Sequence, residues 1–156
     1  MLVNVLGLIL GLGVVWANMF VHEAAHWMFT VQFGGFLSNW HTLPMPGWSY
    51  VIPAAEPWGM LSFYAGGLFA SLFLILLIFL AVQLLRRAEG VFWWWFGFAL
   101  AIGASLELYI GAVEGAFRTI YTPCGSFIVV AILTVVAGCL LYCLVVPPCR
   151  NSTTKR

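Results

Sequence analysis

Residues 18–29 read NMFVHEAAHWMF and bring two histidines, a glutamate and an asparagine into an otherwise apolar stretch. Positions four apart lie on one face of an α-helix, about one turn from each other, so Asn18, His22 and His26 would share a single polar stripe. A charged side chain at the centre of a membrane helix costs about 2.5–3.5 kcal/mol even on the lenient insertion scales. The stripe must therefore be satisfied by a metal ion, by other polar groups or by a water-filled cavity, and it marks a candidate functional site.

The rest of the chain has the composition of a membrane protein. Of its 156 residues, 63% are hydrophobic and 7% are charged, whereas soluble domains carry roughly 25% charged residues. We therefore expect an integral membrane protein whose surroundings are the lipid bilayer. The net charge of +1 gives no reason to expect a nucleic-acid partner, and the oligomeric state is not predicted.

Four segments are long and apolar enough to cross a bilayer as helices, which takes about 20 residues each. They cover approximately residues 2–29, 58–85, 91–121 and 125–146. Residues 30–57 contain several Gly, Pro and Trp residues, which predicts an interfacial loop or short hairpin between the first two helices. The sequence thus predicts an all-α membrane protein with a single transmembrane domain over residues 1–156 and a mobile tail at 150–156.

The basic residues predict how the chain is oriented in the membrane. Arg86 and Arg87 follow the second segment, and Arg150, Lys155 and Arg156 follow the fourth. Cytoplasmic loops carry an excess of Lys and Arg. We therefore expect both termini to be cytoplasmic and residues 30–57 to lie on the opposite side.

The HEAAH sequence at residues 22–26 matches a pattern with a defined metal chemistry. Histidines at positions i and i+4 aim both imidazoles at one point, which suits two ligands of a tetrahedral zinc ion. Glu23 would then stand close to the open coordination position, where it can act as a general base. Asn18 would continue the polar stripe and could hydrogen-bond a ligand or the substrate backbone.

Zinc held by two histidines needs a third protein ligand, and an acidic side chain from another helix is a common completion. The third segment contains Glu107 and Glu114, which are seven residues apart and so share a face. The first and third segments run in the same direction, and by depth Glu114 matches the histidines. We therefore predict Glu114 as the ligand, with Glu107, about 10 Å deeper, as a supporting group or an interhelical contact. Two alternatives stay open: in one, Glu107 replaces Glu114 as the ligand; in the other, Glu114 pairs with Arg118.

In this arrangement the chain resembles the site-2 protease family of intramembrane zinc metalloproteases. HEAAH at the end of a transmembrane helix is followed, as in that family, by a short glycine-containing loop, here FGGF at 33–36. A helix follows with Gly66 and Gly67 where the family has a Gly-Pro…Asn motif, and then VEG at 113–115 where it has an Asp-Gly pair. The proline and asparagine of the motif are replaced, and glutamate stands for aspartate. The resemblance covers roughly residues 15–116.

The resemblance implies hydrolysis of a peptide bond in a transmembrane protein substrate, with zinc as the cofactor. The implied metal ligands are His22, His26 and Glu114, and the implied catalytic base is Glu23. It also implies that residues 30–57 pair with an unwound substrate as an added strand, which Gly34 and Gly35 would allow to approach closely. Family members usually hold the metal nearer the cytoplasmic face, whereas the basic residues of this chain put it nearer the other face.

Two other functions are compatible with the same residues. The chain could be a non-proteolytic metal-binding membrane protein that uses the same ligands. It could also be a structural or assembly subunit in which the polar cluster holds helices together.

Overall fold

The computed structural model describes residues 2–43, 46–52, 57–88, 90–117 and 125–146. Its helices are α1 (Leu2–Gln32), α2 (Trp58–Ala88), α3 (Val91–Phe117) and α4 (Gly125–Val145), and its strands are β1 (Phe36–His41) and β2 (Gly47–Ile52). Each of these four helices is long and apolar enough to cross a membrane. The predicted all-α membrane fold, with a short hairpin between the first two helices, is confirmed.

The first two helices are longer than the sequence predicts, and α1 ends in a defined cap. The Gly35 N–H donates to the carbonyl of Thr30 (2.6 Å), and the Gly34 N–H donates to that of Val31 (3.4 Å). Gly34 has a φ of 87°, the left-handed conformation that glycine adopts without steric cost. This is a Schellman motif, which satisfies the last carbonyls of the helix. It carries α1 to Gln32 instead of residue 29.

The other boundaries lie near their predicted positions. Helix α2 reaches Ala88 instead of residue 85, and α4 ends at Val145 instead of residue 146. Helix α3 is described to Phe117, so the predicted continuation over 118–121 lies outside the described residues. The predicted tail at 150–156 also lies outside them.

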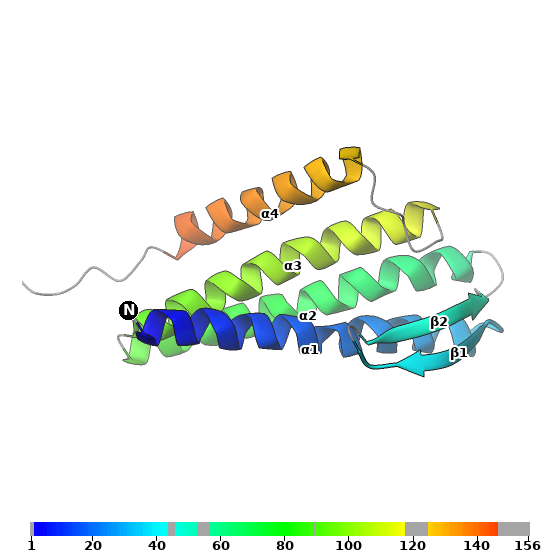
Figure 1. The fold of residues 1–156 in the computed structure, drawn as a ribbon, viewed down its shortest axis with the longest axis horizontal. Helices are drawn as coiled ribbons and strands as arrows, with labels where there is room; N and C mark the ends of the chain where they lie inside the picture. Colours follow the sequence, from blue (N-terminus) through cyan, green and yellow to red (C-terminus); the bar gives the residue numbers. More distant parts are fainter. Residues whose placement is uncertain (1, 44–45, 53–56, 89, 118–124, 147–156) are drawn as a thin grey trace, which may run out of the picture.

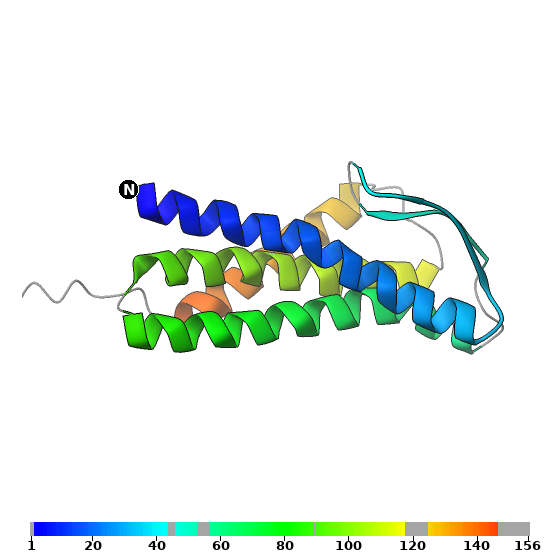
Figure 2. The same cartoon turned by 90° about the horizontal axis from the view of Figure 1, so that it is seen from below.

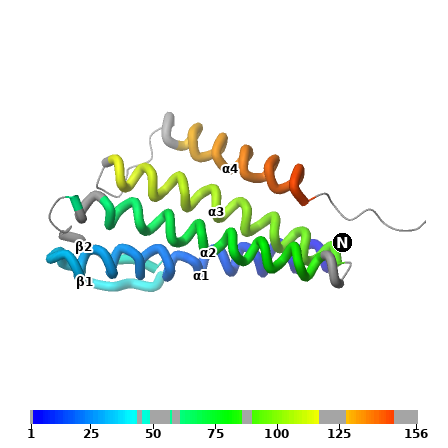
Figure 3. Tube along the Cα trace, turned by 180° about the vertical axis from the view of Figure 1, so that it is seen from behind, coloured from blue at the N-terminus to red at the C-terminus, as the bar shows by residue number. Residues whose placement is uncertain are grey.

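Helices α1, α2 and α3 pack against one another, whereas among the described elements the backbone of α4 comes close only to that of α3. Figure 1 shows α4 on the far side of α3 from α1, and the view from behind in Figure 3 shows the same order. Helices α2 and α3 approach most closely at Gly67 and Gly111, where a Cβ added to Gly67 would lie 2.5 Å from the Gly111 Cα. Small residues at such a crossing let two helix backbones meet.

The hairpin folds back along the C-terminal half of α1 (Figures 1 and 2). Its strands are antiparallel, with Trp40 opposite Trp48 and His41 opposite Gly47. The Trp40 ring also lies 5.8 Å from that of Phe20 on α1. Phe20 precedes the end of α1 by twelve residues, or about 18 Å at 1.5 Å per residue. The connection therefore reaches back beside the helix to the level of the HEAAH residues.

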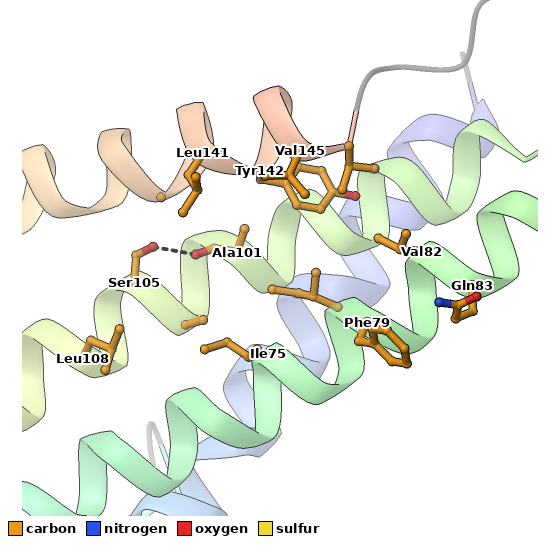
Figure 4. A pocket seen from close by; sticks show the side chains of 14 residues that line it. Ile75, Phe79, Val82, Gln83, Ala101, Ser105, Leu108, Leu141, Tyr142 and Val145 are labelled. Atoms are coloured by element: carbon orange, nitrogen blue, oxygen red, sulfur yellow. Dashed lines mark hydrogen bonds between the residues drawn. The ribbon is translucent and has the colours of Figure 1, made fainter.

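A second feature of the bundle is an apolar cavity of about 560 Å³ between α2, α3 and α4 (Figure 4). Ile75, Phe79 and Leu141 are among its lining residues. Ser105 also lines it, but its hydroxyl donates to the Ala101 carbonyl of its own helix (2.8 Å). None of the predicted site residues lines the cavity, so the candidate site lies elsewhere in the bundle.

Candidate metal centre

Every fourth residue of α1 from 18 to 30 is polar and buried. These residues are Asn18, His22, His26 and Thr30. Four residues turn about 40° beyond a full helical turn, so the polar stripe winds slowly around α1. Asn18 at its start contacts Glu107 of α3, and Thr30 at its end contacts Ser62 of α2. The polar stripe therefore faces the two neighbouring helices and is shielded from lipid.

Both ring nitrogens of His22 meet carboxylates of α3. Nδ1 lies 2.7 Å from an oxygen of Glu107, and Nε2 lies 3.1 Å from an oxygen of Glu114. The His22 side chain is 1% exposed. Asn18, one turn earlier on α1, also contacts Glu107. Its side-chain amide donates to the other oxygen of Glu107 and to the carbonyl of Ala70, both at 3.2 Å. The two glutamates thus hold the two nitrogens of a single ring.

His26 is oriented by a backbone group of α2. Its Nδ1 lies 2.8 Å from the carbonyl oxygen of Ser62. A carbonyl oxygen only accepts, so Nδ1 carries the hydrogen and Nε2 of the neutral ring keeps its lone pair. That Nε2 lies 3.0 Å from Nε2 of His22 and 3.4 Å from an oxygen of Glu114. Two ring nitrogens this close need a proton or a metal ion between them.

His22, His26 and Glu114 form a group that could hold a metal ion, since each offers one ligand atom and these atoms lie within 4.8 Å of one another. Two imidazole nitrogens and one carboxylate oxygen are a donor set found in catalytic zinc sites. Imidazole also suits iron, copper and nickel, so these donors alone leave the metal's identity open.

Glycine at position 66 of α2 keeps a side chain away from these donors. A Cβ added to Gly66 would lie 2.6 Å from Nε2 of His26 and 2.7 Å from Nε2 of His22. Any side chain at this position would therefore collide with both rings. The space beside Gly66 is thus left to the two nitrogens, and the donor set fits a bound metal ion.

Glu23 is half-buried and lies outside the three-residue group. It lines a second cavity, of about 330 Å³, between α1 and the hairpin. Its Oε1 lies 3.7 Å from the position of a Cβ added to Gly47, and the His41 ring lies within 3.4 Å of the same position. The carboxylate is thus directed toward the hairpin, while the neighbouring His22 faces the bundle.

The remaining predicted site residues have different surroundings. Glu107 and Asn18 are 2% exposed, and Glu107 contacts both Asn18 and His22. Their predicted part in supporting a metal ligand or holding a substrate stays a prediction. Gly34 and Gly35 form the cap of α1. The cap alone explains why position 34 is a glycine. The predicted contact of Gly34 and Gly35 with a substrate stays a prediction. Arg118, the alternative partner of Glu114, lies outside the described residues.

Some residues of the site were not predicted from the sequence. Thr30 extends the four-residue spacing of the stripe, so the sequence does contain that signal. Ser62 contributes a backbone carbonyl to His26 and a hydroxyl 2.6 Å from that of Thr30. A backbone contact of this kind has no residue-type signature. The space beside Gly66 has no such signature either.

Comparison of the chain with protein-family models, with curated proteins and with solved structures found no match. Any functional assignment therefore rests on the residues and their geometry.

Proposed function

We propose that the protein is an intramembrane zinc metalloprotease of the site-2 protease type, which hydrolyses a peptide bond of a membrane-embedded substrate. One observation carries this proposal. The two histidines of HEAAH and Glu114 converge beside Gly66, while Glu23 of the same motif faces a cavity next to the hairpin. The proposed metal ligands His22 and His26 and the proposed general base Glu23 are thus carried by adjacent turns of one helix.

The proposed ligands are His22, His26 and Glu114. A zinc ion held by them would supply a Lewis acid that polarises the scissile carbonyl and activates water. Glu23 takes a proton from the water molecule as the oxygen of that water bonds to the carbonyl carbon. It then gives that proton to the amide nitrogen as the C–N bond breaks. Glu107 holds the ring of His22 in place throughout, through the contact with Nδ1.

The hairpin is the proposed site at which substrate backbone is held. A transmembrane helix must unwind before one of its peptide bonds can be cleaved, and its freed N–H and C=O groups then need partners. Strands β1 and β2 pair only with each other among the described residues, so each has an edge able to accept an added strand.

A structural polar core is the competing function, and the same contacts give it some support. The pairs His22–Glu107 and His26–Ser62 are short enough to be hydrogen bonds in their own right, and they join α1 to α3 and α2. A protein with this function would keep its helices together through the cluster without binding metal. Metal analysis of the purified protein separates the two functions.

The substitution Glu23→Gln tests the proposed mechanism. The amide keeps the size of the side chain but cannot accept the proton of water, so we expect metal binding to persist and cleavage of a transmembrane reporter to fall at least about 100-fold. Both quantities can be measured on protein purified in detergent and returned to lipid vesicles. Full cleavage by this variant would contradict the role of Glu23.

We further propose that both chain termini are cytoplasmic, from the basic residues after the second and fourth helices. Protease treatment of sealed membrane vesicles of known orientation, with a tag on each terminus, tests this. Both tags should be cut from the cytoplasmic side, and protection of both from that side would reverse the orientation.

A further inference from the structure

The cavity beside Glu23 has walls of an unusual kind for a small membrane bundle. We call it the Glu23 pocket. Its lining residues are Phe20, Glu23, Ala24 and Trp27 of α1, Trp40 of β1 and Trp48 of β2. Four of the six are aromatic, and the only ionisable one is the proposed base. The pocket therefore joins a large apolar surface to the group that would act on a peptide bond.

The pocket is an open groove. Its volume is about 330 Å³, and four of its lining residues are exposed, namely Phe20, Ala24, Trp27 and Trp40. A side chain of a segment that lies along α1 and the hairpin can therefore enter it from outside the bundle. An extended segment is the form in which a peptide can lie against a strand.

One group at the pocket favours a peptide over a lipid chain. The Glu23 carboxylate is part of the lining, and a hydrocarbon chain would leave it without a hydrogen-bond donor. The backbone N–H groups of an unwound segment supply such donors.

The aromatic walls set the kind of side chain that fits. Trp40 and Trp48 lie edge to face with ring centroids 4.9 Å apart, and Phe20 packs against Trp40. Such surfaces gain most from burying another aromatic or a large aliphatic group. An acidic side chain would meet the charge of Glu23 and is excluded.

We propose that the Glu23 pocket receives a bulky apolar side chain, such as Phe or Leu, from the substrate residue next to the bond that is cleaved. This inference rests on the proposed function and adds a substrate preference to it. The pocket would select the cleavage position along an unwound segment, because a residue seated there brings its neighbouring peptide bond next to Glu23.

A pair of matched variants tests the preference. Ala24→Leu places a larger side chain in the pocket, whereas Ala17→Leu makes the same change two turns earlier on α1, at an exposed position outside the pocket. The measurement is the ratio of kcat/KM for two transmembrane reporters that carry Phe or Ala beside the cleaved bond, as located by mass spectrometry.

We expect the wild type and Ala17→Leu to share a preference for Phe of about tenfold or more, and Ala24→Leu to lose most of it. A change of a few methylene groups in an apolar pocket is worth about 10- to 200-fold. An equal ratio in all three proteins would overturn the proposal.

A second measurement does not depend on cleavage. Glu23→Gln protein is mixed with a reporter that carries a benzophenone side chain at the same position, irradiated and digested. Crosslinks to Trp27, Trp40 or Trp48 support the pocket, and crosslinks confined to α4 or to lipid overturn it. If these crosslinks form but the wild type cleaves no reporter, the proposed function fails while the pocket stands as a peptide-binding site.

Discussion

At the scale of single residues, the histidines of the HEAAH motif are oriented from outside the motif. Glu107 contacts Nδ1 of His22, and the Ser62 carbonyl contacts Nδ1 of His26. Both contacts leave Nε2 as the atom that faces Glu114. Partners on the far nitrogen of a ligating histidine set its tautomer and its ring angle. The two rings are thus oriented so that both Nε2 atoms and Glu114 could ligate one cation.

The substitution Glu107→Gln should weaken metal binding without removing it. Glutamine keeps an oxygen that can accept from Asn18, but its amide would oppose the Nδ1–H of His22 with a second donor. Loss of such a supporting group typically lowers metal affinity 10- to 100-fold. Competition with a chelator of known affinity measures the change. Unaltered affinity would show that Glu107 does not support the ligand.

The residue scale also shows what the sequence could predict and what it could not. The spacing of His22 and His26 predicted a shared face, and the parallel course of two helices predicted that Glu114 lies at their depth; these residues do lie together. The space beside Gly66 depends on how closely the α2 backbone passes the two rings. That distance arises from the packing of three helices, so no local pattern contains it.

At the scale of elements, the bundle depends on close helix crossings. Gly67 meets Gly111 and the backbone of Glu107, and a Cβ added to Gly115 would contact the ring of Tyr64. These crossings bring α2 close to α3, and Gly11 lets α1 approach α3, since a Cβ added there would lie 2.6 Å from the Cβ of Ala99. The carboxylates of Glu107 and Glu114 on α3 thereby reach His22 on α1. Helix packing and the metal centre are therefore coupled.

Gly67→Leu should destabilise the bundle, because the new side chain would have to push α2 and α3 apart. Overpacking of this type costs about 1–3 kcal/mol, and more where backbone is in the way. Gly13→Leu is the matched control, since a Cβ at Gly13 has no atom within 4 Å. Unfolding in SDS, followed by circular dichroism, measures both variants. Similar midpoints for the two would contradict the crossing.

Element boundaries were less predictable than element types. Apolar length identified each of the four helices, because a membrane-spanning helix is recognised by composition alone. The end of α1 depends on the hydrogen bonds from Gly34 and Gly35 to the carbonyls of Val31 and Thr30. These bonds close the helix just before β1 begins. The hairpin was predicted from its turn-forming residues, but its return along α1 depends on contacts such as Phe20 with Trp40, which are remote in sequence.

At the scale of the whole molecule, the candidate site involves three of the four helices and the hairpin. Helices α1 and α3 supply the residues that could hold a metal ion, α2 supplies the Ser62 carbonyl that contacts His26, and the hairpin lies against α1 next to Glu23. Helix α4 packs on α3 and contributes none of these residues. Composition could predict four membrane-spanning helices, but not which of them surround the candidate site, since all four are similarly apolar.

The metal content of the purified protein tests the central claim most directly. We expect about one zinc ion per chain in the wild type, in Glu23→Gln and in the control Gly13→Ala. We expect essentially none in His22→Ala, which lacks a ligand, or in Gly66→Ala, whose Cβ would displace both histidine rings. Plasma mass spectrometry on protein of verified helix content gives the numbers. A wild type without metal, or equal metal in the wild type and His22→Ala, would contradict the account.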